Sequence, residues 1–148
     1  MSDFQVAVSG GSFSASRRSL RFQKAIRETH RSPFAAQMVG IAPVTMRAWA
    51  HNRGFECSVA APAGHTKDGY SWRIYSFGDL MRLRIISRLV AIGWRVERAI
   101  QALGKPVPQI ELAYSVVISF DSIDTVVLLD PVREQVLEII ESIEGAAA

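Results

Sequence analysis

The chain has 148 residues, of which 49% are hydrophobic and 21% are charged, with a net charge of +3. This length and apolar content can form a buried core, so they exclude a wholly disordered chain and favour one domain with an appendage. No apolar run approaches the ~20 residues of a transmembrane helix, and the first residues lack the basic start and apolar core of a secretory signal. We therefore expect a soluble, cytoplasmic protein with no membrane partner.

Charge is distributed unevenly along the chain. Residues 1–105 contain sixteen Lys and Arg against six Asp and Glu, a net +10. Residues 106–148 contain one Arg against eight acidic residues, a net −7. A basic segment joined to an acidic one favours a module that binds a polyanion and a second module that does not touch it. The alternative is two solvated faces that differ in sign.

Residues 1–31 are expected to form a basic, flexible arm. Its first sixteen residues are rich in serine and glycine, although Phe4, Val6 and Val8 alternate as in a short strand. Ser19–Glu28 is predicted to be either a helix or an arm that orders on a phosphate backbone. The candidate backbone contacts are Arg17, Arg18, Arg21 and Lys24.

Phe34–Gly54 predicts two short helices joined by a tight turn. Ser32 is the expected N-cap of the first helix, and Pro33 its first helical residue. Gly40 can adopt the positive φ that turns the chain, and Pro43 can begin the second helix. This spacing indicates a helix-turn-helix, whose second helix lies in the major groove of DNA. The side chains expected to face the partner are Thr45, Arg47 and His51.

A hairpin is predicted after the helix-turn-helix. Phe55–Asp68 contains proline and glycine and is expected to be a loop between short strands, whereas Gly69–Tyr75 is typical of the returning strand. Such a hairpin would be a wing that places Arg73 near the adjacent backbone or minor groove. In the alternative interpretation, Trp72 and Tyr75 are core aromatics.

Two helices should follow the hairpin. Ser76 can cap the first, with Asp79 in the first turn where the helix dipole favours a carboxylate. Gly93 ends this helix, and a shorter one over Val96–Leu103 stops at Gly104. The arginines expected on the exposed sides of the first helix are Arg82, Arg84 and Arg88.

The acidic segment predicts two strands and a helix. Apolar residues fall at every even position of Ile110–Phe120, which indicates a half-buried strand. Thr125–Leu129 is a second strand, and Pro131 begins an amphipathic helix. This unit is too small to be stable alone, so it packs on the first domain or on another copy. The predicted dimerisation residues are Val116, Ile118, Val136, Ile139, Ile140 and Ile143.

Three parts of the sequence resemble the MerR family of bacterial transcription regulators in their order and spacing. They are GIAPVTMRAW at 40–49, RIYSFGDLMRLRIISRLVAIGW at 73–94, and the short helix ending at Leu103. The resemblance covers roughly Pro33–Leu103. It implies a winged helix-turn-helix that binds double-stranded DNA as a homodimer in the bacterial nucleoid, with RNA polymerase or another regulator as a further partner.

The family resemblance also implies which side chains contact DNA. The matching positions are Thr45, Arg47, Trp49, Arg73 and Tyr75, and we add His51 and Arg53 of the same predicted helix. Ser71 and Trp72 stand where the family often has Gly and an aromatic or basic residue, and Ala50 stands where it usually has Glu. The long coiled-coil helix that typical members use to dimerise is also missing here.

We therefore predict a mainly α fold with a small β component. Its segments are a basic arm (1–31), a winged helix-turn-helix domain (32–105), and an acidic strand-strand-helix segment for dimerisation or regulation (106–148). Two other functions remain open: a recombination or excision accessory factor, and a protein-interaction adaptor with a degenerate winged helix.

The sequence contains no pattern that favours an enzyme, a cofactor or a metal site. There is no nucleophile–base pair and no phosphate-binding glycine loop. Cys57 is the only cysteine, which excludes an internal disulfide and a CxxC metal site. The three histidines have no paired spacing with carboxylates or thiols, so we expect surface or capping roles for His30, His51 and His65.

Overall fold

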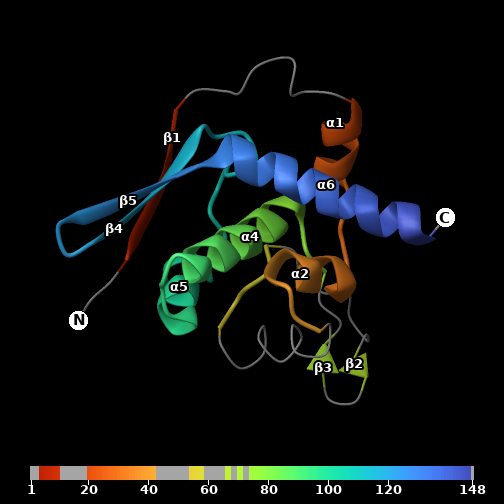
Figure 1. Cartoon of the computed structure of the whole chain (residues 1–148), viewed down its shortest axis with the longest axis horizontal. Coiled ribbons are helices and arrows are strands. Elements are labelled where there is room, and N and C mark those ends of the chain that lie inside the picture. Colours follow the sequence, from red (N-terminus) through yellow and green to blue (C-terminus); the bar gives the residue numbers. More distant parts are fainter. Residues whose placement is uncertain are drawn as a thin grey trace.

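The computed structural model describes residues 4–10, 20–42, 54–58, 66–67, 70–71 and 74–147. These residues form a mixed α and β structure, in which helices pack beside an antiparallel sheet (Figure 1). No helix in these ranges is both long and apolar enough to cross a membrane. The elements are β1 (Gln5–Ser9), α1 (Leu20–Arg27), α2 (Ser32–Val39), β2 (Thr66–Lys67), β3 (Tyr70–Ser71), α4 (Phe77–Ala91), α5 (Val96–Leu103), β4 (Ser115–Phe120), β5 (Ile123–Leu128) and α6 (Leu129–Ala147).

The three-stranded sheet pairs a strand near the N-terminus with two strands of the acidic C-terminal segment. Its strand order is β1-β4-β5, and both pairings are antiparallel. Val6 lies opposite Ile118, so the short strand expected near Phe4 is confirmed. The expectation that this part of residues 1–31 is flexible is wrong for β1, because its backbone is hydrogen-bonded to β4. The first and third predicted segments therefore meet in one sheet.

The strand predicted over Ile110–Phe120 begins five residues late. Residues 108–112 form turns, and Gln109 has a φ of 64°. Of the even-numbered residues before the strand, Ile110 is buried, whereas Leu112 and Tyr114 are 42% and 52% exposed, so the alternating pattern does not mark one buried face there. The hairpin between β4 and β5 closes through Asp121 and Ser122, both with positive φ. Alternation alone could not separate a buried turn residue from a strand residue.

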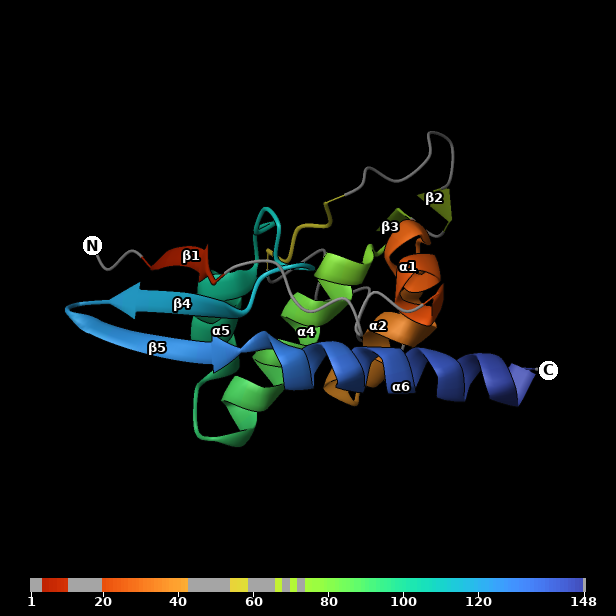
Figure 2. The same ribbon diagram turned by 90° about the horizontal axis from the view of Figure 1, so that it is seen from above.

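Helix α4 lies at the centre of the molecule, with α1, α2, α5 and α6 packed around it (Figures 1 and 2). Ser76 and Asp79 form the predicted cap in reciprocal form: each side chain accepts a hydrogen bond from the backbone of the other. Residues 77–83 are all buried, since neighbours cover the helix on every side of its first two turns. The helix predicted from the Ser76 cap to Gly93 is confirmed as α4, which ends at Ala91, and the helix predicted over Val96–Leu103 is confirmed as α5.

Several side chains that were expected on the surface are buried. Arg82 is only 1% exposed, so its predicted place on an open side of α4 is wrong. Arg84 is half-buried and hydrogen-bonded to Gln135, whereas Arg88 is exposed as expected. Arg133, the single basic residue of the acidic segment, is also 1% exposed.

The acidic segment packs on the rest of the chain, which is one of the two arrangements expected for it. The prediction that its apolar residues form a dimer interface is wrong for the four that lie in the chain's own core: Val116, Ile118, Val136 and Ile140. Ile139 is partly buried against that core, and Ile143 is half-buried. Side chains that are at most 3% exposed have almost no surface left for contact with a second copy.

Helix α2 begins one residue earlier than predicted. Its N-cap is Arg31, and Ser32 is its first helical residue, so the prediction of a serine cap is wrong. Pro33 lies at the start of the helix, where its missing N–H has no cost. Gly40 ends α2 with a φ of 73° and donates its N–H to the carbonyl of Ala36, which confirms the predicted turn.

A backbone bridge connects the segments that precede α2 and α4. His30 and Tyr75 each donate an N–H to the other's carbonyl at 2.7 Å. Both side chains are buried, so the expectation of a surface or capping histidine is wrong for His30. Burial lowers the pKa of His30, while a hydrogen bond with the Ala25 backbone and the carboxylates of Glu28 and Glu144 oppose the shift.

This burial predicts a pH dependence of stability. The folded-state pKa of His30 lies below the ordinary value of 6.5, so the unfolded chain binds more protons over the interval between them. The contribution of His30 is fully present above pH 6.5 and is lost as the pH falls towards the folded-state pKa. Urea unfolding of the wild type and of His30→Phe at pH 7.5 and 5.5 should show a smaller decrease in the variant. An equal decrease in the stability of both proteins would show that groups other than His30 cause the pH dependence.

Candidate nucleic-acid interface

The residues predicted to contact DNA most directly lie outside the described part of the chain. This applies to Thr45, Arg47, Trp49, His51, Arg53 and Arg73, and to Arg17 and Arg18 of the arm. Arg21 lies in α1, but its side chain is not described. What the structure describes is the framework on either side of residues 43–53, namely α2, residues 54–58, the β2–β3 hairpin, α4 and α5.

Asp79 is the hydrogen-bonding centre of this framework. Its carboxylate accepts two bonds from the backbone N–H of Ser58, at 3.1 Å to each oxygen, and one from the Ser58 hydroxyl at 3.2 Å. It also accepts the Ser76 backbone N–H at 2.9 Å as part of the helix cap. A single carboxylate therefore fixes both the start of α4 and the segment that follows residues 43–53.

Arg82 completes this arrangement one helical turn later. Its Nη2 forms an ion pair with Asp79 at 2.6 Å and donates to the Glu56 carbonyl at 2.6 Å, while Nη1 donates to the Leu103 carbonyl at 2.8 Å. The guanidinium carbon lies 4.4 Å from the centre of the Phe55 ring. Burial lowers the pKa of Arg82, and the Asp79 carboxylate opposes that shift. We call Ser58, Asp79 and Arg82 the clamp.

A close backbone contact reinforces the clamp. The Glu56 N–H donates to the Gly104 carbonyl at 2.7 Å. A Cβ at position 104 would collide with the carbonyl of Ile100 and press on that of Gly54, so a side chain there would displace the end of α5 or residue 54. Gly54 itself has a φ of 81°, which L side chains rarely adopt. The chain leaving residues 43–53 is thus held in one path against α4 and α5.

The chain entering residues 43–53 is also anchored. Ala35, Ala36 and Met38 of α2 are at most 2% exposed, because this face packs on α4. Arg84 of α4 donates to the Met38 carbonyl at 3.3 Å, close to the end of α2. Both ends of the predicted recognition segment are therefore fixed to the same central helix.

A short hairpin follows, but its first strand, Thr66–Lys67, lies within the predicted loop, and its second strand covers only Tyr70–Ser71 of the predicted Gly69–Tyr75. Thr66 pairs with Ser71 and Lys67 with Tyr70 in an antiparallel ladder, and the chain then reaches the His30–Tyr75 bridge. Tyr75 is 0% exposed and its ring lies 6.4 Å from that of Phe55. The prediction that its side chain contacts DNA is wrong, and the alternative of a core aromatic is confirmed for this residue.

Of the two alternatives for Ser19–Glu28, the helix is confirmed as α1, but it lies away from the hairpin. Phe22 and Ala25 bury one face, with Phe22 edge-on to Phe77 at 5.5 Å, while Lys24 and Arg27 are exposed. Figure 1 shows α1 and the β2–β3 hairpin at opposite edges of the molecule. The structure therefore does not bring Lys24 to the predicted wing, and its 3.9 Å pairing with Glu28 is an exposed contact of small energetic value.

The sequence predicts Asp79 only as a residue of the helix N-terminus, and it does not predict the contacts of Ser58 and Glu56 or the burial of Arg82. The available signal was the Asp–Arg spacing of three residues within a helix whose surrounding positions are almost all apolar. In the described ranges, no cluster of three or more His, Cys, Asp or Glu side chains is arranged to hold a metal ion.

Comparison with protein-family models, curated proteins and solved structures finds no match to this chain. The resemblance to the MerR family thus remains a prediction from the motifs quoted above.

The clamp predicts a large loss of stability when one member is removed. Arg82→Met leaves Asp79 as an uncompensated buried charge and removes the donor from two carbonyls, so we expect a loss on the order of 3–5 kcal/mol. Arg88→Met is the matched control on the exposed side of the same helix and should change stability by about 0.5 kcal/mol or less. Urea unfolding measures both variants, and similar midpoints would contradict the role given to the clamp.

Proposed function

We propose that this protein is a sequence-specific, double-stranded DNA-binding transcription regulator with a winged helix-turn-helix. Residues 43–53 would lie in the major groove, and the β2–β3 hairpin would lie on the flanking backbone. The observation that carries the proposal is the clamp, because it fixes the segment that leaves residues 43–53 to the two helices that follow the hairpin. Direct readout requires such preorganisation, since recognition side chains must keep one register against the bases.

The order of the described elements supports this proposal. Helix α2, the turn at Gly40, the β2–β3 hairpin, α4 and α5 follow one another as the three motifs predict. All of them except the hairpin contribute to one core centred on α4. This arrangement leaves the hairpin projecting at one edge of the molecule, as a wing requires (Figure 1).

The placement of charge gives further support. The exposed acidic side chains of α6 are Glu134, Glu138, Glu141 and Glu144. Figure 1 shows α6 separated from the hairpin by α2 and α4. A polyanion that approached the hairpin would therefore meet the basic part of the chain and avoid the acidic helix.

The proposal predicts which charge removals weaken DNA binding. Arg47→Ala combined with Arg73→Ala should lower the affinity for DNA by at least about tenfold, because base and backbone contacts are lost together. Each lost phosphate contact should also reduce the slope of log affinity against log salt by about one unit. Fluorescence anisotropy with random duplex at about 50 mM and about 200 mM salt measures both quantities.

The matched control removes two positive charges from the opposite edge of the molecule. Lys24→Ala combined with Arg27→Ala changes the net charge equally on α1 and should have the smaller effect. Unchanged binding by a folded Arg47→Ala, Arg73→Ala variant would reject the site. Failure of the wild type to bind duplex at low salt would favour the adaptor function instead.

We also propose that the protein forms a homodimer, but through the edge strand β5 and not through the residues predicted from the sequence. Strand β5 is an edge of the described sheet, with β4 on one side only. Val126 and Leu128 are 58% and 51% exposed, and they share a groove with Ile92, which is 74% exposed. The strand contains no proline or lysine that would protect an exposed edge.

A second copy of the chain can pair with this edge strand. Antiparallel pairing of two β5 strands about a two-fold axis places the same surface on both sides, as closed homodimers require. Centring the axis on Val126 sets Asp124 of one strand opposite Leu128 of its partner, so the one charged residue of β5 does not face itself. The pairing would extend the three-stranded sheet across both copies.

If β5 forms the dimer interface, a single charged substitution in this strand should abolish dimerisation. Val126→Lys should shift the protein to monomer, because two ammonium groups would lie opposite each other at the axis. Ala7→Lys is the control: it places the same charge on an exposed position of β1, at the other edge of the sheet, and should leave the dimer intact. Sedimentation equilibrium distinguishes the two states. Equal association by both variants would exclude the β5 edge.

A further inference from the structure

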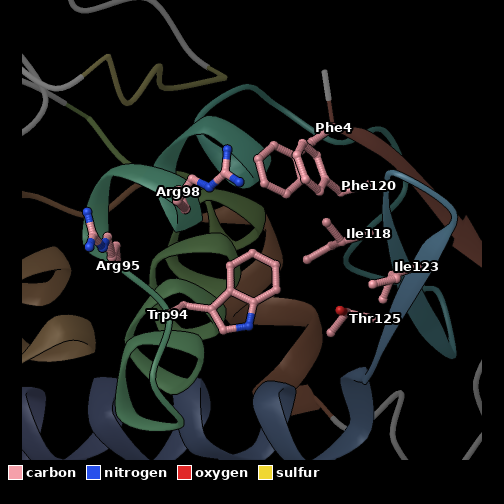
Figure 3. A pocket seen from close by; sticks show the side chains of 8 residues that line it. All are labelled: Phe4, Trp94, Arg95, Arg98, Ile118, Phe120, Ile123 and Thr125. Atoms are coloured by element: carbon pink, nitrogen blue, oxygen red, sulfur yellow. The ribbon is translucent and has the colours of Figure 1, made fainter. Parts of the chain in front are cut away.

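An open pocket of about 350 Å³ lies between β1, the start of α5 and the β4–β5 hairpin (Figure 3). We propose that it binds a small molecule that combines a flat aromatic body with a carboxylate. The proposal does not depend on DNA binding. Its volume is at the lower end of the range for small-molecule sites, which favours a ligand of one or two rings.

Aromatic side chains from three elements form one wall. Phe4, just before β1, stacks on Phe120 of β4 with ring centres 4.8 Å apart and 30° between the planes. Trp94, in the turn before α5, lies 6.0 Å from Phe4. All three side chains are only partly buried and line the pocket, so part of their aromatic surface is accessible to a ligand. Exposed aromatic faces of this kind bind flat apolar molecules by offset stacking.

A guanidinium lies directly beside these rings. The Arg98 carbon Cζ is 4.6 Å from the centre of Phe120 and 5.5 Å from that of Phe4. Figure 3 shows the group at the same end of the pocket as both rings, with Arg95 on the adjacent turn. Within the described ranges, neither arginine has a carboxylate at ion-pair distance. A half-buried arginine without an acidic partner is well suited to pair with a carboxylate through two parallel hydrogen bonds.

The opposite wall is aliphatic with a single hydroxyl. Ile118 lies at the base of the pocket, and Ile123 lies at its mouth with 69% of its surface exposed. Thr125 supplies the hydroxyl (Figure 3). This wall provides too few hydrogen-bonding groups for the several hydroxyls of a sugar, whereas an aromatic carboxylate would bury its ring and pair its single charge with an arginine.

The first experiment compares three probes with the same ring system. Isothermal titration of the full chain should show binding of 2-naphthoate, binding of neutral 2-naphthamide at least about tenfold weaker, and no measurable binding of cationic 2-naphthylmethylamine. Equal affinity for all three would indicate a nonspecific apolar surface and overturn the proposal. Absence of naphthoate binding at millimolar concentration would overturn it too.

The second experiment locates the site with charge-matched variants. Arg98→Gln should weaken naphthoate binding by at least about tenfold and leave naphthamide binding nearly unchanged. Lys105→Gln removes the same charge from an exposed residue just beyond α5 and should have no effect. Arg95→Gln, at an exposed lining position, tests the same pocket if the Arg98 variant fails to fold. Wild-type affinity in both arginine variants would place any binding elsewhere and refute the assignment.

Discussion

The buried ion pair of Asp79 and Arg82 is the interaction on which the rest of this structure depends. Both side chains are 1% exposed, so folding removes two charges from water at a substantial cost. The cost is offset because nearly every polar atom of the pair is used: the carboxylate accepts backbone N–H groups, and the guanidinium donates to two carbonyls and to the carboxylate. The result is a fixed geometry that an apolar pair of similar volume would not impose.

A similar Asp–Arg ion pair, with its carboxylate 23% exposed, occurs a second time in the chain. Asp130 lies in the first turn of α6, and Arg133 three residues later pairs with it at 2.8 Å. Arg133 donates to the carbonyls of Glu111 and Ala113, just as Arg82 donates to those of Glu56 and Leu103. In both cases an arginine in the first turns of a helix satisfies carbonyls that have no partner within regular structure. The two arginines hold the least regular segments of the described chain against its two longest helices.

The sequence predicted the elements whose formation is decided by local chemistry. The cap at Ser76, the turn at Gly40 and the end of α5 before Gly104 depend on a few neighbouring residues, and the structure has all three. The burial of Arg82 and Arg133 depends on carbonyls from distant segments, which the sequence does not reveal, and Arg82 was therefore predicted on the surface from its charge alone. The apolar pattern of residues 106–148 showed that these residues bury a face, but it could not show that the partner is this chain's own α4.

Helix α5 links the two sites of the molecule. Its first turn, with Arg98 and the preceding Trp94, lines the aromatic pocket, and its last carbonyl, from Leu103, is held by Arg82 of the clamp. The helix is eight residues long and is packed on α4, so its two ends are held in a fixed position relative to each other. The end of this helix also contacts residues 54–58, because the Gly104 carbonyl accepts the Glu56 N–H. The N-terminal strand, which the sequence suggested was part of a flexible arm, pairs with β4 and so places Phe4, immediately before it, against Phe120 in the wall of that pocket.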